Sequence, residues 1–466
     1  MSLNPQMQLQ RSSLPEGLNL HKLACGCAVK IDLQRVVYPA LRRIRPELER
    51  LGVGLAERED ADIFPLTQDF SFERKVFPLD PQAIEPLAPG RAPRAVTVSA
   101  VYRAFRPEEL AERWLTAYRA LLKNGARLYV GKGHTIEAYS PDDEFIHFDL
   151  YEPLGPRQKG FRVANNDTIQ LIDPARPLEA PEQVEVALCN ALNDLFALGA
   201  VEDVRVVPFY AAPTRALAEQ IAANVKAFAE RYGFSLEPQE PVSDSTLLLG
   251  ATVLGATSRR PPTFYRELRE GDLVLVHRPF GDLAPINVLI EALELGPDAL
   301  ADADFSLEEV REAIEERVAV MRRPNLDVGR LIQRFCPEGD EPFDARRHIK
   351  ATADLSGPGI DVFRELAELA GRDIALERIP LAHPELVRWA SRNFLLPNGT
   401  AGTNGALAVV AAPEVIERVA AELEDLGHQP QIIGRVGGEG GHLWVPPETR
   451  DYIADWPEAY RVTGED

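Results

Sequence analysis

Residues 184–200 read VEVALCNALNDLFALGA, and this stretch decides the fold of the middle of the chain. Its apolar residues recur every three or four positions, which predicts a helix over 182–199. Asn190 and Asp194 are four residues apart, so both side chains point to one spot in apolar surroundings. A buried carboxylate needs either a cation or a dense shell of hydrogen bonds. This helix alone is compatible with a functional site and with a structural aspartate bonded to backbone N–H groups.

Strands and helices alternate on both sides of this helix. Thr214 is suited to start a helix that Gly233 ends, and Ser306 with Glu309 forms a capping box for another. The end of the chain, 406–447, predicts strand, helix, strand, turn and strand. We expect other strands at 96–105, 126–140, 145–154, 204–211, 246–257 and 271–281, and other helices at 29–50, 107–124, 214–232, 285–295 and 306–322. This mixture predicts a two-domain chain of the α+β (mixed α/β) class.

Length and charge exclude several kinds of protein. A chain of 466 residues has room for two or three domains, and 45% hydrophobic residues are ordinary for a globular protein. A net charge of -21 argues against nucleic acid or an anionic membrane as a partner. No run approaches the roughly 18–20 apolar residues of a membrane span. The first 24 residues lack the apolar core of a secretion signal, so we expect a cytoplasmic protein.

The four cysteines are too few for a disulfide framework. Cys25 and Cys27 are separated by a single residue, and such a pair suits a nucleophile or a soft metal ligand. The alternative is two incidental small residues near the N-terminus. A zinc site would need two further ligands, which the sequence does not place nearby. Cys189 and Cys336 lie in apolar helical patterns and are expected in the core.

Six motifs follow one another along the chain, at 25–27, 58–63, 190–199, 271–281, 351–359 and 395–414. Their order resembles that of selenophosphate synthetase (selenide, water dikinase), a family of the aminoimidazole ribonucleotide synthetase (PurM-like) superfamily. The resemblance implies a PurM-like two-domain fold, in which an N-terminal β-sheet or barrel half with flanking helices precedes a C-terminal α/β half. We therefore expect a flexible N-terminal segment at 1–50, an ATP-binding domain at 51–260 and a second domain at 263–466. An α+β insertion is expected at about 65–165.

The resemblance also implies the ligands and the residues that hold them. In the superfamily, three aspartates hold Mg2+ on ATP, and their counterparts here are Asp60, Asp194 and Asp354. Carboxylate oxygens are the ligands that Mg2+ prefers. Residues implied at the nucleotide are Asp173, Asn190, Gly250, Gly357, Gly359, Thr400 and Gly402. For the glycine-rich stretch around Thr400, turn chemistry alone equally favours a simple surface turn.

The implied catalytic residues are Cys25, which would handle the chalcogen, and Lys30, which would act at the phosphates. Two residues separate Lys30 from the cysteine pair, where the family has its lysine directly after the pair. Gly250-Ala251-Thr252 also stands where the family has Gly-Gly-His; His134 is a possible replacement, but an ordinary exposed or structural histidine is the more frequent case.

The activity implied is an ATP- and Mg2+-dependent phosphotransfer to a selenium or sulfur nucleophile, which gives a seleno- or thiophosphate, carried out by a homodimer. Two alternatives remain open. One is another ATP-dependent synthetase or kinase of the superfamily, such as a purine-pathway synthetase or a thiamine-phosphate kinase. The other is a non-catalytic protein that binds a nucleotide or sulfane sulfur.

Overall fold

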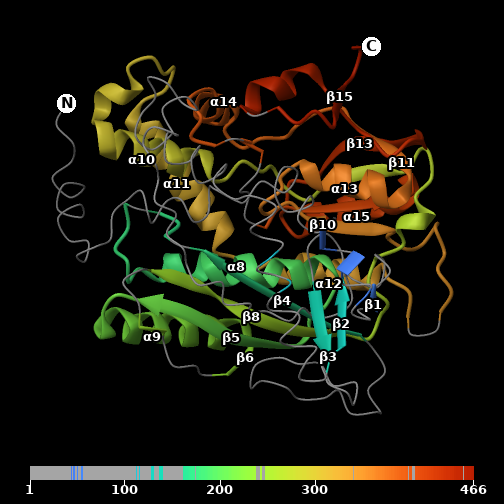
Figure 1. Ribbon diagram of the computed structural model, residues 1–466, viewed down its shortest axis with the longest axis horizontal. Coiled ribbons are helices and arrows are strands. Elements are labelled where there is room, and N and C mark those ends of the chain that lie inside the picture. The colour runs from blue at the N-terminus through green and yellow to red at the C-terminus, as the bar shows by residue number, and fades with distance from the viewer. Residues whose placement is uncertain are drawn as a thin grey trace.

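Helix α8 (Pro181–Ala197), which contains the decisive stretch, lies between the two large sheets of the molecule (Figure 1). The computed structural model describes residues 43–44, 46–47, 50, 54–55, 112, 115, 127–130, 136–139, 161–169, 171–173, 175–237, 242–243, 247–338, 341–396, 398–400, 405–454 and 456–465. Both faces of α8 are buried, because it contacts strands of each sheet. We call the part of the chain up to residue 260 the first half and the part after it the second half. Helix α8 is therefore the element at which the two halves meet.

The first sheet has the strand order β4-β8-β5-β6. Its strands are β4 (Phe161–Ile169), β8 (Leu248–Thr257), β5 (Glu202–Ala212) and β6 (Ser235–Leu236), and β7 (Val242–Ser243) also pairs with β5. Helices α8 and α9 (Arg215–Tyr232) cover the face that carries Val206, Leu249 and Val253. Thr214 caps α9 by accepting the N–H of Leu217.

The second sheet has the strand order β10-β12-β9-β13-β11-β14-β15. Its strands are β10 (Ala351–Asp354), β12 (Leu407–Ala411), β9 (Leu273–Val276), β13 (Gln431–Glu439), β11 (Arg372–Leu376), β14 (Leu443–Val445) and β15 (Tyr460–Val462). Alternate residues of a strand point to opposite faces. One face of this sheet packs on α13 (Asp361–Ala370), and the other packs on α12 (Leu326–Arg334) and α15 (Pro413–Asp425).

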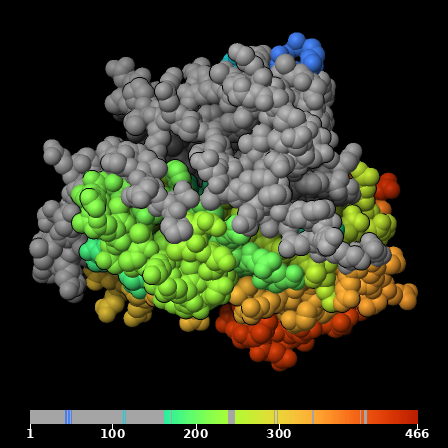
Figure 2. Space-filling model, turned by 90° about the horizontal axis from the view of Figure 1, so that it is seen from below, coloured from blue at the N-terminus to red at the C-terminus, as the bar shows by residue number. Residues whose placement is uncertain are grey.

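The largest hydrophobic cluster of the described residues includes residues from both sides of position 260, where we expect the first domain to end. It joins α8, α9 and the first sheet to α10 (Ala284–Leu295), α11 (Leu307–Met321) and α14 (Pro384–Arg392). Seen from below, the green residues of the first half lie against the orange and red residues of the second (Figure 2). The two halves therefore share this cluster.

The fold class predicted from the sequence, mixed α+β, is confirmed by these two sheets and their helices. The helix at 182–199, the capping box at Ser306 and the strand–helix–strand end of the chain are also confirmed. Strand β4 was not expected. The three short strands β1 (Gly54–Leu55), β2 (Arg127–Val130) and β3 (Ile136–Tyr139) form a small sheet, and β2 and β3 confirm the strands expected at 126–140.

Other expectations fall on residues that are not described. The strands at 96–105 and 145–154 lie outside the described residues, as do most of the helices at 29–50 and 107–124. Among the described helices, none combines the length and the apolar composition that crossing a membrane requires.

A buried histidine follows strand β9. His277 is fully buried, and its Nδ1 accepts the N–H of Leu407 at 2.9 Å. Its ring lies 5.1 Å from that of His428, which itself pairs with Asp327. Burial, with the nearby charges of Arg278 and His428, holds the pKa of His277 well below its usual value near 6.5.

This histidine predicts a dependence of stability on pH. Below about pH 6.5 the unfolded chain binds a proton at His277 that the folded chain does not bind. The free energy of unfolding therefore decreases as the pH is lowered, by up to about 1.4 kcal/mol per pH unit. We expect His277→Asn to reduce this slope, because asparagine can accept the Leu407 N–H but does not titrate. Urea unfolding between pH 5 and 7.5 measures it. An unchanged slope in His277→Asn would contradict the assignment.

Candidate functional site

Four polar side chains meet where α8 faces strand β4. The Asn190 side chain donates to Asp167 Oδ2 at 2.5 Å. One turn further along α8, Asp194 accepts from Asn165 Nδ2 at 2.8 Å, and the same amide nitrogen donates to the carbonyl of Ala191. We call Asn165, Asp167, Asn190 and Asp194 the polar cluster. The expectation that Asn190 and Asp194 point to one area is met, and each finds an amide–carboxylate partner on β4.

Alternation along β4 explains this arrangement. Asn165 and Asp167 are two residues apart and share the face toward α8, whereas Asn166 points to the opposite face and donates to Thr252 Oγ1 at 2.8 Å. Gly250 allows β8 to lie close to this part of β4, because a Cβ on Gly250 would be 2.1 Å from the backbone oxygen of Asp167. Gly250 therefore supports the cluster through its lack of a side chain.

The aspartate of the second half, Asp354, stands at the end of β10. Its Oδ1 accepts from the backbone N–H and the hydroxyl of Ser356, both at 2.9 Å. Asp354 shares a strand face with Thr352, whose hydroxyl donates to the carbonyl of Ala197 on α8. Asp354 therefore lies on the side of the second sheet that faces α8.

A chain of hydrogen bonds joins Asp354 to α8. Ser356 Oγ accepts the N–H of Gly405 at 2.7 Å, and the carbonyl of Gly405 accepts from Asn325 Nδ2 at 2.6 Å. The backbone N–H of Asn325 donates to Asn193 Oδ1 at 3.1 Å. Asn193 directly precedes Asp194 on α8. We call Asn193, Asn325, Gly405 and Ser356 the junction clasp, and it links the two predicted aspartates across the junction of the halves.

Two predicted glycines and Thr400 surround the turn that follows Asp354. Gly357 and Gly359 have φ angles of 92° and 58°, which favour glycine. Thr400 is fully buried; its hydroxyl donates to Asn398 Oδ1 at 2.7 Å and accepts the N–H of Ile360, at the start of α13, at 3.3 Å. The structure therefore joins Thr400 to the turn that contains both glycines.

Asp173 has a different set of partners. Its carboxylate accepts from the N–H of Ala175 and from Arg176 Nε, at 2.9 and 2.8 Å, and Gln183 bonds to its backbone. Burial raises the pKa of Asp173, although the bonds from Ala175 and Arg176 act in the opposite direction. These contacts hold the loop before α8 and do not bring Asp173 into the polar cluster.

The remaining predicted site residues, Cys25, Lys30, Asp60 and Gly402, lie outside the described residues, as do Cys27 and His134. Asp167 and Asn165 were not predicted. The signal for them was the run Asn165-Asn166-Asp167, three polar residues in a row in a segment that is otherwise apolar enough for a strand.

The donor atoms at the junction are oxygens, which suit a hard cation such as Mg2+. Within the described residues, no three or more histidine, cysteine, aspartate or glutamate side chains are grouped so that they could hold a metal ion. Mg2+ is often bound through one or two carboxylates together with phosphate oxygens and water. Asp194 and Asp354 each offer oxygens of the kind that such a Mg2+ takes.

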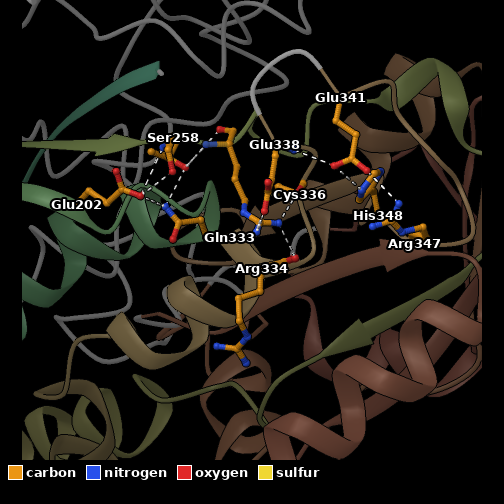
Figure 3. A network of polar contacts seen from close by, with 11 residues as sticks. Glu202, Ser258, Gln333, Arg334, Cys336, Glu338, Glu341, Arg347 and His348 are labelled. Carbon is orange, nitrogen blue, oxygen red and sulfur yellow. Dashed lines mark hydrogen bonds and ion pairs between the residues drawn. The ribbon is translucent and has the colours of Figure 1, made fainter. Parts of the chain in front are cut away.

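A second polar network fixes the other end of α12 (Figure 3). Gln333 Nε2 donates to Glu202 Oε1 at 2.6 Å and to Thr257 Oγ1 at 3.1 Å. Arg259 Nη1 donates to the carbonyl of Cys336 at 3.0 Å. Further partners are the carbonyl of Arg334 and the side chain of Glu338, and Glu341 extends the network to Arg347 and His348. Helix α12 is thus tied to the first half at its C-terminal end here and at its start through Asn325.

Comparison with solved structures finds distant likenesses. The thiamine-monophosphate kinase of Stenotrophomonas maltophilia K279a is 18% identical, with 76% of this chain and 96% of that chain covered and a TM-score of 0.45. The Aquifex aeolicus thiamine monophosphate kinase is 16% identical, with coverages of 62% and 89% and a TM-score of 0.42. Escherichia coli HypE is 19% identical, with coverages of 61% and 81% and a TM-score of 0.42. No family model and no curated protein matches. With TM-scores below 0.5, these likenesses carry no argument about reaction or substrate.

Proposed function

We propose that this protein binds ATP with Mg2+ at the junction of its two halves and transfers a phosphoryl group from ATP to a selenium or sulfur nucleophile. One observation carries the proposal. Asp194 and Asp354 are 160 residues apart in sequence. The junction clasp nevertheless links Asp354 to Asn193, the residue next to Asp194 on α8. Two fixed carboxylates from opposite sides suit a metal ion that accompanies a chain of phosphates.

Residues of this chain would position the metal ion and orient the carboxylates that hold it. Asp194 and Asp354 would hold Mg2+, which when bound offsets the negative charge of the phosphates. Asn165 fixes one oxygen of Asp194, and Ser356 fixes one oxygen of Asp354. Asn190 does the same for Asp167, the neighbour of Asp194 in the polar cluster. Carboxylates that are already oriented need little rearrangement as charge develops, which is the usual source of electrostatic catalysis.

The choice of acceptor rests on the sequence. Cys25 would handle the chalcogen and Lys30 would act at the phosphates, as the resemblance implies. The chalcogen would attack the γ-phosphorus of ATP; the new bond to phosphorus forms as the bond to the bridging oxygen breaks, and the nucleotide leaves with that electron pair. The homodimer implied by the same resemblance is part of this proposal.

The test is phosphorus NMR on the purified protein with ATP and Mg2+, with and without selenide or sulfide. A new phosphorus resonance that requires the chalcogen, and that Cys25→Ala abolishes, is the expected result. Phosphate release that needs no chalcogen would favour a different acceptor and hence another ATP-dependent kinase or synthetase. ATP that is bound but left intact in every mixture would favour the non-catalytic alternative.

A further inference from the structure

The side chain of Asn193 points away from the polar cluster and toward the second half. It is 1% exposed, although it neighbours the site aspartate on α8. Its Oδ1 accepts the N–H of Asn325 at 3.1 Å. Residues at successive positions of a helix point in different directions, so Asn193 and Asp194 hold different partners. One turn of α8 therefore contacts strand β4 through Asp194 and the second half through Asn193.

The side chain of Asn325 forms a hydrogen bond across the junction and does not cap its own helix. It occupies the N-cap position of α12, where an asparagine side chain usually accepts an N–H of the first turn. Its side chain makes no such bond to α12, every residue of which is described. It donates instead to the carbonyl of Gly405 at 2.6 Å and is 8% exposed. The contact with Gly405 thus replaces a cap.

Gly405 fits this place because it has no side chain. Its φ angle is 80°, and a Cβ would lie 2.1 Å from Asn193 Nδ2 and 3.1 Å from Asn325 Nδ2. Both of its backbone polar groups are engaged, the carbonyl by Asn325 and the N–H by Ser356, which in turn donates to Asp354. Any larger residue would have to displace the side chain of Asn193 and so disturb its bond to Asn325.

We propose that Asn193, Asn325 and Gly405 are positioning residues that set the separation of Asp194 and Asp354. This rests on the proposed function, in which the two aspartates share one metal–nucleotide ligand. Removal of a residue that orients a metal ligand without touching the metal typically lowers metal affinity or activity by about 10–100-fold. The clasp would therefore affect metal binding far more than nucleotide binding.

The halves do not depend on the clasp to stay together. The shared hydrophobic cluster and the network around Arg259 join them independently. The bond from Thr352 to the carbonyl of Ala197 is a further link. Loss of the clasp should therefore shift the junction without separating the halves, which makes its role measurable.

The experiment compares Asn193→Ala, Asn325→Ala and Gly405→Ala with the parent protein. Mn2+ replaces Mg2+, and electron paramagnetic resonance measures its affinity in the presence of a non-hydrolysable ATP analogue. We expect the Kd for Mn2+ to rise roughly tenfold or more, and the KM for Mg2+ to rise more than kcat falls. Affinity for the analogue without metal should stay within about twofold, since the hydrogen bonds of the clasp lead from α8 to Asp354 and none of its residues is assigned to the nucleotide.

Asn224→Ala is the matched control. Asn224 is also a buried amide, 8% exposed, and donates to the carbonyl of Glu179 at 2.9 Å within the first half. Its loss removes a comparable hydrogen bond away from the junction. Equal changes in Mn2+ affinity for Asn224→Ala and Asn193→Ala would overturn the proposal, because the effect would then be one of general stability.

A distance measurement separates this proposal from the proposed function. Spin labels carried by non-canonical amino acids at the exposed Lys226 on α9 and Glu417 on α15 report how the two halves are oriented. We expect a broadened distance distribution in Asn193→Ala and Gly405→Ala, and the parent distribution in Asn224→Ala. A parent protein that binds no Mn2+–nucleotide overturns the proposed function, whereas unchanged distances in the clasp variants overturn the positioning role.

Discussion

Replacement of Asp194 by asparagine is expected to lower the Mg2+-dependent turnover of ATP with the chalcogen by about 10²–10³-fold, the size of effect seen when one electrostatic partner is removed from an active site. Asparagine keeps the shape of the side chain and an oxygen that can accept from Asn165. The change therefore removes charge and leaves packing intact. Steady-state consumption of ATP in the presence of selenide or sulfide, measured at several Mg2+ concentrations, gives the effect.

Glu182→Gln is the control for Asp194→Asn. Glu182 lies on the same helix, and its carboxylate accepts from Arg322 Nη1 at 2.9 Å, away from the polar cluster. Glu182→Gln should retain turnover close to that of the parent. Ligand binding to the folded state raises Tm, so the parent should show a shift with Mg2+ and ATP that Asp194→Asn lacks. Parent-like turnover by Asp194→Asn would remove Asp194 from the site.

Loss of the ammonium group of Lys350 is expected to cost about 3–5 kcal/mol of the free energy of unfolding, because a buried carboxylate is left without its partner. Lys350 and Asp272 are 2% and 4% exposed, and the Lys350 Nζ lies 2.8 and 2.7 Å from the two oxygens of Asp272. Lys350→Met replaces the ammonium with an apolar group of similar length. Urea unfolding followed by tryptophan fluorescence measures the loss, since Trp389, Trp444 and Trp456 all lie in the second half.

The double variant Lys350→Met with Asp272→Asn tests the cause. It removes both charges, while asparagine can still accept the N–H of Arg269, which Asp272 accepts at 2.7 Å. We expect this variant to be more stable than Lys350→Met alone. If the two are equally unstable, lost packing around the Lys350 stem, and not the unpaired carboxylate, is the cause.

The sequence predicts those elements that are defined by local rules. The periodicity of α8, the cap of α9 at Thr214 and the capping box of α11 each depend on residues within one turn or along one helix face. Strand β4 was missed for the same reason. Its middle residues, 165–168, are polar on both faces, so the alternation that identifies a half-buried strand is lost.

In the candidate site, too, local spacing predicts some residues, whereas others depend on contacts between distant parts of the chain. Asn190 and Asp194 could be paired from their spacing, because a helix places residues four apart on one face. Their partners on β4 depend on the register between a strand and a helix, which local periodicity does not specify. The bond between Asn193 and Asn325 joins residues 132 apart in the chain, and nothing near either residue indicates it. The resemblance implies Asp173 at the nucleotide, but Arg176 and Ala175 engage its carboxylate.

The hydrophobic cluster that spans both halves has a consequence for how the chain is made. Residues of α8 such as Leu188 and Leu192 share one cluster with Leu289 of α10 and with Trp389 of α14. A nascent chain that has left the ribosome only as far as residue 260 would therefore expose an apolar side of α8 with its final partners still unsynthesised. We expect the first half to mature late, after α14 has emerged, so that newly made chains depend on chaperones until then.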